Sequence, residues 1–263
     1  MTSCPSCGSF LSVGVRHCSI CGARAAVLSP QNLSGPIGPG VLLGGRYRII
    51  ASLSAGAMGT VWRGEDERLH GRPCAVKALS VTDLGGLDAA EALAWFDREI
   101  EVLSRLRHSA ICDVKDAVTD GDHRYLILEL IEGHTMAEEL VLRGAPGLPP
   151  ADVLRWGATL GEALAYLHSQ QPPIIFRDLK PANIMLRPNG QVVLIDFGIA
   201  RPFVNAGATA IGTGGYAPPE QYQGLAEPRS DIYGLAATLH HLLTGRDPTV
   251  QIPFTFPPLR SLK

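Results

Sequence analysis

The sequence has little excess charge and no long hydrophobic run. Its 263 residues include 23 lysines and arginines against 25 aspartates and glutamates, so the formal net charge is −2. With aromatic residues at only 6% and no basic stripe, the chain lacks the electrostatic footprint of a nucleic-acid-binding protein. No apolar run approaches the roughly 20 residues that a membrane-spanning helix needs. These absences predict a soluble, cytoplasmic chain that is long enough to form substantial hydrophobic cores.

Cysteines are also few, with six in the chain. Two CxxC-Gly turns contain four of them: Cys4, Cys7, Cys18 and Cys21. Four thiolates at this spacing suit tetrahedral Zn²⁺, whose binding folds a segment too small to fold alone, and we predict a zinc ribbon over residues 1–28. Two disulfides are the alternative, disfavoured because no signal peptide is seen. A redox dithiol would not explain the repeat.

Residues 29–45, SPQNLSGPIGPGVLLGG, separate this segment from the rest of the chain. Their glycine and proline content opposes both helix and strand, which predicts a linker. The ribbon itself has few positive charges, and we expect it to bind a protein partner or to regulate the following domain. A nucleic-acid adaptor is the weaker alternative.

The most informative segment is residues 176–198, which contain FRDLKPANIM and, nine residues later, IDFG. Asp178 and Asn183 are five positions apart, and Asp196 follows the apolar run VVLI. Phosphoryl transfer from ATP requires a carboxylate that orients the attacking hydroxyl, plus a carboxylate and an amide that bind Mg²⁺. The segment resembles the catalytic loop and DFG motif of protein kinases, and within that family it is similar to the bacterial, eukaryotic-like serine/threonine kinases.

This resemblance implies an α+β, bilobal protein-kinase fold over residues 46–263. It implies a small β-rich lobe at about 46–130 and a larger helical lobe at about 131–263, within which Val153, Trp156, Leu160, Leu164 and Leu167 predict a long buried helix. The family normally has further helices after the segment that ends this chain. We therefore expect a C-terminally truncated large lobe, and a fragment rather than an unusually small lobe.

The resemblance extends to the nucleotide site. LSAGAMGTV, residues 53–61, matches the glycine-rich loop with Ser54 at the first glycine position, and CAVK ends at Lys77, which is implied to pair with the phosphates. LELIEG, residues 128–133, resembles the hinge, where backbone groups would bind adenine. The residues implied to contact ATP, apart from Lys77 and its partner, are Leu53, Gly56, Gly59, Val61, Ala75, Glu129 (by its carbonyl) and Ile131 (by its N–H).

The side chain of Lys77 requires a carboxylate partner that fixes its orientation. Apolar residues at three-four-three spacing predict a helix over residues 89–106. Glu99 lies beside the apolar face of that helix and is the predicted partner of Lys77. Glu101 is the alternative, but it lies on a different face because it is two residues away.

The resemblance implies roles for several further residues. In the catalytic loop Phe176 replaces the usual histidine, Arg177 would receive a phosphate on the activation segment, and Lys180 would contact the transferred phosphate. Thr209 is the predicted regulatory phosphosite, and Thr213 is expected to contact Asp178 and Lys180.

Two acidic residues have expected structural roles. Glu220 belongs to the counterpart of the A-P-E motif and would pair with an arginine from the missing helices. Asp231 opens an apolar helix and would bind the backbone of the catalytic loop.

The sequence thus predicts a signalling enzyme with a zinc ribbon. It would transfer the γ-phosphoryl group of Mg·ATP to serine or threonine hydroxyls of proteins and phosphorylate its own activation segment. Asp178 would orient the hydroxyl and accept its proton, while Asn183 and Asp196 would bind Mg²⁺. The alternative is a pseudokinase or scaffold whose ribbon binds a partner protein.

Overall fold

The computed structural model describes residues 2–3, 10–11, 37–56, 59–79, 100–120, 123–143, 146–196 and 213–261. The chain divides into two compact units, Met1–Ile37 and Gly38–Lys263. In the first, β1 (Thr2–Ser3) and β2 (Phe10–Leu11) pair antiparallel. The four cysteines predicted to bind zinc lie outside the described residues.

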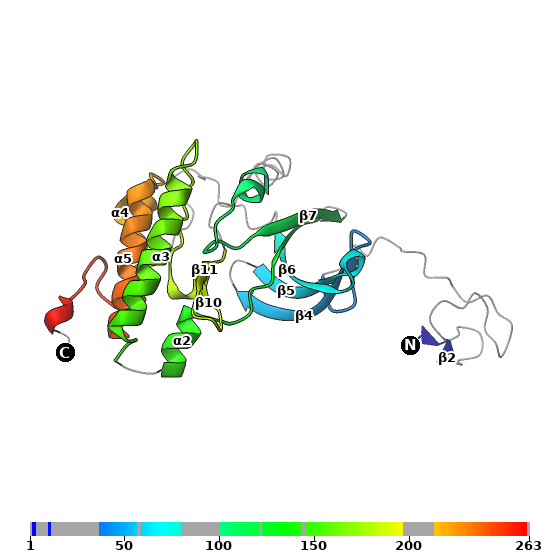
Figure 1. Cartoon of the computed structure of the whole chain (residues 1–263), viewed down its shortest axis with the longest axis horizontal. Helices are drawn as coiled ribbons and strands as arrows, with labels where there is room; N and C mark the ends of the chain where they lie inside the picture. Colours follow the sequence, from blue (N-terminus) through cyan, green and yellow to red (C-terminus); the bar gives the residue numbers. More distant parts are fainter. Residues whose placement is uncertain are drawn as a thin grey trace. The chain divides into compact units, whose positions relative to one another are not determined.

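The N-terminal half of the second unit is an antiparallel sheet of six strands (Figure 1). Its spatial order is β3-β4-β5-β6-β8-β7. The bounds are β3 (Leu42–Leu43), β4 (Tyr47–Gly56), β5 (Gly59–Asp66), β6 (Arg72–Leu79), β7 (Val114–Asp120) and β8 (His123–Glu129). A 3-10 helix, η1 (Glu67–Leu69), joins β5 to β6.

The strand β4 has one face in the core, as its alternating burial shows. Tyr47 and Ile49 are 2% and 1% exposed, whereas Ile50 is 36% exposed. Successive side chains of a strand point to opposite faces, so this pattern places one face inside and one outside.

The structure differs from the predicted linker near its end. Leu42 and Leu43 form β3, which pairs with β4, although both lie in the range 29–45. The physical reason is burial, because Leu43 is 2% exposed and its backbone takes part in the sheet.

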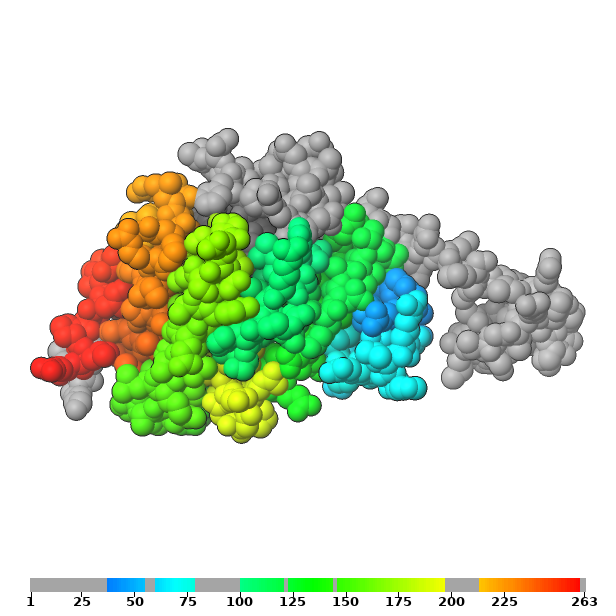
Figure 2. Space-filling view, turned by 45° about the horizontal axis from the view of Figure 1, so that its top comes forward, coloured from blue at the N-terminus to red at the C-terminus, as the bar shows by residue number. Residues whose placement is uncertain are grey.

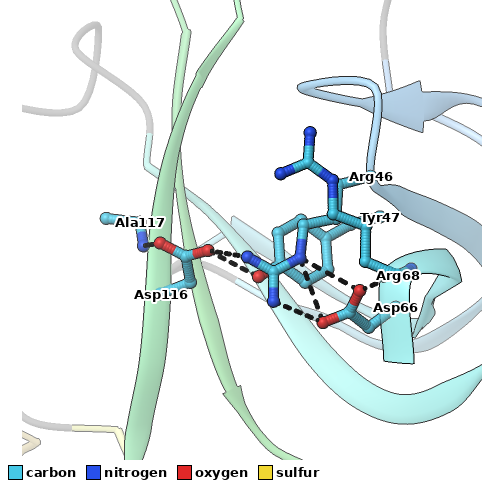
Figure 3. A network of polar contacts seen from close by, with 6 residues as sticks. All are labelled: Arg46, Tyr47, Asp66, Arg68, Asp116 and Ala117. Atoms are coloured by element: carbon cyan, nitrogen blue, oxygen red, sulfur yellow. Dashed lines mark hydrogen bonds and ion pairs between the residues drawn. The ribbon is translucent and has the colours of Figure 1, made fainter.

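A polar network around Arg46, just before β4, connects strands of the sheet (Figure 3). Arg46 pairs with Asp66 at 2.6 Å and with Asp116 at 2.8 Å, and the Tyr47 hydroxyl donates to Asp116 at 2.6 Å. The Arg46 hydrogen bond lowers the pKa of the Asp66 carboxyl. Because Asp66 ends β5 and Asp116 lies in β7, the network links residues far apart in sequence.

The C-terminal half is mainly helical. Its helices are α2 (Met136–Arg143), α3 (Pro150–His168), α4 (Pro219–Tyr222) and α5 (Pro228–Thr244), with 3-10 turns η3 (Pro181–Asn183), η5 (Pro248–Val250) and η6 (Leu259–Ser261). A small sheet has the order β11-β10-β9, formed by β9 (His134–Thr135), β10 (Ile184–Leu186) and β11 (Val192–Leu194).

The long helix α3 is the centre of this lobe, and α5 packs beside it (Figure 1). The predicted buried helix is confirmed, since its five apolar residues between Val153 and Leu167 are all at most 2% exposed. Among the described residues, no helix combines the length and apolarity that crossing a membrane would require.

Candidate active site

A buried carboxylate on α5 is hydrogen-bonded to the backbone of the catalytic loop. Asp231, which is 1% exposed, accepts hydrogen bonds from the backbone N–H of Phe176 at 2.9 Å and of Arg177 at 2.8 Å. The Nε2 atom of His168 lies 2.7 Å from the same carboxylate. Arg177 has φ 69°, a left-handed conformation that is uncommon for a residue other than glycine. The two backbone bonds stabilise that conformation and so determine the path of the loop.

Three residues singled out in the sequence converge around Asp178. Thr213 donates its hydroxyl to Asp178 Oδ1 at 2.9 Å, and Lys180 Nζ lies 2.8 Å from Asp178 Oδ2 and 2.7 Å from Thr213 Oγ1. The amide nitrogen of Asn183 donates to the backbone carbonyl of Asp178 at 2.8 Å and to its Oδ2 at 2.9 Å. Asp178 and Asn183 are each 6% exposed. The carboxylate is therefore held in one orientation by charged and neutral donors.

Lys77 and Asp196 meet across the two lobes. The ammonium of Lys77, on β6, pairs with Asp196 Oδ1, and the side chains are 14% and 23% exposed. Asp196 has φ 60°, again in the left-handed region. Glu99, the predicted partner of Lys77, lies outside the described residues. Glu101 pairs instead with Arg105 one helical turn away, and both side chains are mostly exposed.

The strand after Asn183, β10, pairs with the strand before Asp196, β11, and this pairing brings the two metal-binding candidates close together. Ile184 pairs with Leu194, and the N–H of Ile195 donates to the backbone carbonyl of Asn183 at 2.9 Å. Since the amide nitrogen of Asn183 bonds to Asp178, its side-chain oxygen is the atom left to bind a cation. An amide oxygen with a nearby carboxylate fits the oxygen preference of Mg²⁺. The residues that the structure describes contain no cluster of three or more His, Cys, Asp and Glu side chains suited to a metal.

The nucleotide-site candidates lie along the sheet. Gly56 and Gly59 pair at the end of the β4–β5 hairpin, while residues 57–58 are outside the described range. Val61 lies opposite Lys77, and Ala75 lies opposite Leu128. Leu53 is 50% exposed.

The predicted hinge residues lie at the end of β8 and directly after it. The N–H of Glu129 donates to the carbonyl of Asp113 at 2.9 Å, and its carboxylate pairs with Arg187 at 2.7 Å. Ile131 is 8% exposed and packs with Cys112. Burial raises the pKa of the Cys112 thiol to about 12, so it stays neutral and is no nucleophile at neutral pH.

Sequence reasoning missed three residues that form hydrogen bonds in or near the catalytic loop. The side-chain amide of Gln221 donates to the carbonyl of Arg177 at 2.7 Å, and Ser230 donates to Glu220 at 2.9 Å. The arginine predicted to pair with Glu220 would come from helices outside this sequence, so that pairing stays a prediction. His168 is the third, and it lies 63 positions from Asp231, so no local pattern could have identified it. Thr209 lies outside the described residues.

The two-lobed fold, with lysine, aspartate and asparagine meeting between the lobes, is the architecture of a kinase domain. Residues 47–253 match the protein kinase domain family. Serine/threonine-protein kinase PknL of Mycobacterium bovis is 39% identical over 212 residues, which cover 79% of this chain and 51% of PknL. Serine/threonine-protein kinase PrkC of Bacillus subtilis is 34% identical over 214 residues, which cover 80% of this chain and 32% of PrkC.

Solved structures agree with these relatives. The crystal structure of the Mycobacterium tuberculosis PknI kinase domain superposes with a TM-score of 0.70 at 29% identity, covering 87% of this chain and 86% of that one. The chain belongs to the protein kinase family, with a domain similar to those of bacterial serine/threonine kinases. It spans about half the length of PknL and less of PrkC.

Proposed function

We propose that the chain is an ATP-dependent kinase that phosphorylates serine and threonine hydroxyls of proteins. The observation that carries this proposal is the convergence of Thr213, Lys180 and Asn183 on the Asp178 carboxylate, at 2.8–2.9 Å. Such a constellation suits the positioning of a hydroxyl for phosphoryl transfer. The relatives PknL and PrkC are serine/threonine-protein kinases, which favours an active kinase over the pseudokinase alternative.

Each side chain has a distinct part in this mechanism. Asp178 orients the acceptor hydroxyl and takes up its proton, and Asn183 holds Asp178 in place through its amide nitrogen. Lys180, 2.8 Å from Asp178, stabilises negative charge on the group being transferred. Most of the rate enhancement then comes from positioning and preorganised charge, because the protein forms no covalent intermediate.

The residues between the lobes would bind ATP as a substrate. Asn183 and Asp196 would bind Mg²⁺, which neutralises charge on the phosphates. Lys77 would pair with the phosphates and be directed by Glu99. Because Lys77 pairs with Asp196 in the described structure, nucleotide binding would give this lysine a second acidic partner.

Regulation is proposed to involve the activation segment. Thr209 would be phosphorylated by the kinase itself, and Arg177 would bind the resulting phosphate. Burial lowers the pKa of the Arg177 guanidinium. Since the pKa of an arginine is ordinarily far above neutral, the group remains charged at neutral pH and can pair with a phosphate.

The N-terminal cysteines are proposed to bind Zn²⁺ in a ribbon that recruits a protein partner or regulates the kinase. We expect deletion of residues 1–28 to change either kinase regulation or partner binding. If neither changed, this role for the ribbon would be refuted.

The proposed activity is tested by the intact mass of the purified chain after incubation with Mg·ATP. Mass should increase in steps of one phosphate, and the Asp178→Asn variant should show none. The matched control is Asp120→Asn, at the end of β7, which should behave like the unchanged protein. A mass increase that persists in Asp178→Asn would contradict the assignment. No increase in the unchanged protein, with a generic protein substrate also unmodified, would favour the pseudokinase.

A further inference from the structure

We propose that Arg187 is a positioning residue for the nucleotide, which holds the hinge so that the backbone carbonyl of Glu129 meets the amino group of adenine. The inference rests on the proposed kinase activity, which requires ATP, and it assigns a source of selectivity for adenine over guanine. Arg187 lies 58 positions from Glu129 and belongs to none of the motifs in the sequence.

Arg187 has a fixed position at the start of a tight hairpin. It directly follows β10, its N–H donates to the carbonyl of Gln191 at 2.8 Å, and its own carbonyl accepts from the N–H of Gly190 at 2.9 Å. These two hydrogen bonds fix the point from which the side chain extends. In Figure 2 the yellow region, which contains the hairpin of β10 and β11, lies at the surface of the molecule.

The end of the hinge passes close to this point. Gly133 has φ +133°, and a Cβ placed there would lie 2.1 Å from the carbonyl oxygen of Leu186 and 3.2 Å from the Cα atom of Arg187. Only glycine fits this conformation and this approach. Directly afterwards β9 pairs with β10, with His134 opposite Leu186. Backbone contacts therefore attach the end of the hinge to the C-terminal lobe.

An ion pair attaches the beginning of the hinge to the same place. The Nη2 atom of Arg187 lies 2.7 Å from Oε1 of Glu129, and the two side chains are 26% and 31% exposed. Glu129 is the last residue of β8, in the sheet of the N-terminal lobe, whereas Arg187 belongs to the C-terminal lobe. The pair thus links the two lobes at the residue that is predicted to contact adenine.

Two further contacts hold the backbone of Glu129. Its N–H donates to the carbonyl of Asp113, and its carbonyl oxygen lies 3.7 Å from the sulfur of Cys112. The neutral thiol is a weak donor, so at this distance the oxygen remains able to accept a stronger hydrogen bond. Both contacts come from the segment before β7. Arg187 adds a restraint from a separate segment, on the other lobe.

Adenine and guanine differ at the atom that this carbonyl would meet. Adenine carries an amino donor there, whereas guanine carries a carbonyl acceptor. A carbonyl that is held in place therefore attracts adenine and repels guanine, and a site built around such a hydrogen bond rejects the base that lacks the donor. A hinge that is held less firmly would place the carbonyl less accurately and would select adenine less strongly.

The free energy of the ion pair limits the size of this effect. A partly exposed ion pair shifts an equilibrium by at most about fivefold. When a ligand binds one conformation of the hinge, its apparent Kd rises as the population of that conformation falls. Removing the charge of Arg187 should therefore raise the Kd of an adenine nucleotide by about threefold to fivefold.

The test measures the Kd of Mg·ADP and of Mg·GDP for the full chain by calorimetry, which does not depend on turnover. Arg187→Met should raise the Kd of Mg·ADP by about threefold to fivefold and that of Mg·GDP by less than about twofold. Arg187→Lys keeps the charge and should return the Kd of Mg·ADP to within about twofold of its original value. In kinase assays Arg187→Met should raise KM for ATP more than it lowers kcat.

Two further variants separate positioning from general effects. Lys115 pairs with Asp113 at 3.0 Å, and the side chains are 40% and 33% exposed, but both residues belong to the N-terminal lobe. Lys115→Met is therefore the matched control and should leave both Kd values unchanged. Adding Glu129→Gln to Arg187→Met should weaken the binding of Mg·ADP no further, because the two changes remove the same contact.

The outcomes distinguish this inference from the proposed function. If Arg187→Met bound Mg·ADP as the unchanged protein does, or weakened Mg·ADP and Mg·GDP equally, the positioning role would be wrong, and Asp178-dependent transfer would still support the kinase activity. The expected change in Kd values, without Asp178-dependent transfer to the chain or to a generic substrate, would support the positioning role and overturn the activity. Binding of neither nucleotide by the unchanged protein would overturn both proposals.

Discussion

Removing the Asp231 carboxylate should loosen the catalytic loop and destabilise the fold. Asp231 is 1% exposed and accepts three hydrogen bonds: from the N–H groups of Phe176 and Arg177, and from His168. The Asp231→Ala variant removes the acceptor that these donors use. Water cannot replace it readily in so buried a position, so the loss should appear in the free energy of unfolding.

The magnitude follows from the number of buried donors. Each buried polar group left without its partner costs about 1–3 kcal/mol. The two backbone N–H groups alone should therefore reduce the free energy of unfolding by about 2–6 kcal/mol, out of a total of about 5–15 kcal/mol. Asp231→Asn keeps one acceptor oxygen, so about half of that loss is expected. The loop geometry around Arg177 should also relax, which lowers kcat.

Urea denaturation of the full chain, followed by circular dichroism and by kinase assay, measures both effects. The control is Asp152→Ala, on the first turn of α3, whose carboxylate is 31% exposed and pairs with Arg155 at the surface. Exposed ion pairs contribute about 0–1 kcal/mol, so this variant should change little. If Asp231→Ala were no more destabilising than Asp152→Ala, the anchoring argument would be wrong.

Three further predictions concern other parts of the chain. Burial lowers the pKa of His241 from 6.5, and its Nδ1 lies 2.6 Å from the Tyr216 hydroxyl. The unfolded chain then binds the proton more readily, so the free energy of unfolding should fall as the pH decreases below about 6.5, and a His241→Gln variant should show a smaller fall in urea titrations. Gly215 has φ +81°, and a Cβ placed there would lie 2.4 Å from the carbonyl oxygen of Pro248. Gly215→Ala should therefore lower the free energy of unfolding by about 1–3 kcal/mol. Gly214→Ala, whose Cβ would meet nothing within 4 Å, should leave it unchanged. Equal effects of the two variants in thermal melts would contradict this prediction. Elemental analysis should find stoichiometric Zn²⁺ in the purified chain. Cys18→Ser should lower the zinc content, whereas Cys74→Ser, which replaces a buried cysteine outside the repeat, should not. A zinc content unaffected by either change would refute the ribbon.

The residues of the candidate site could be identified from sequence because their chemistry requires short, fixed spacing. Asp178, Lys180 and Asn183 lie within six positions of one another, and a single loop can therefore bring them together. The helix α3 was equally predictable, since its apolar residues repeat with the period of a helix. The strand β3 was missed because the glycine and proline around it resemble a linker, while the burial of Leu43 is a tertiary property.

The sequence by itself determined the kinase family, the catalytic loop and the candidate residues, because these depend on residue types at close spacing. Only the tertiary structure decided which partner each one meets. It paired His168 with Asp231, Lys77 with Asp196, and Ser230 with Glu220. The physical reason is that such contacts depend on how separate elements pack, and packing across tens of residues leaves no periodic signal in the chain.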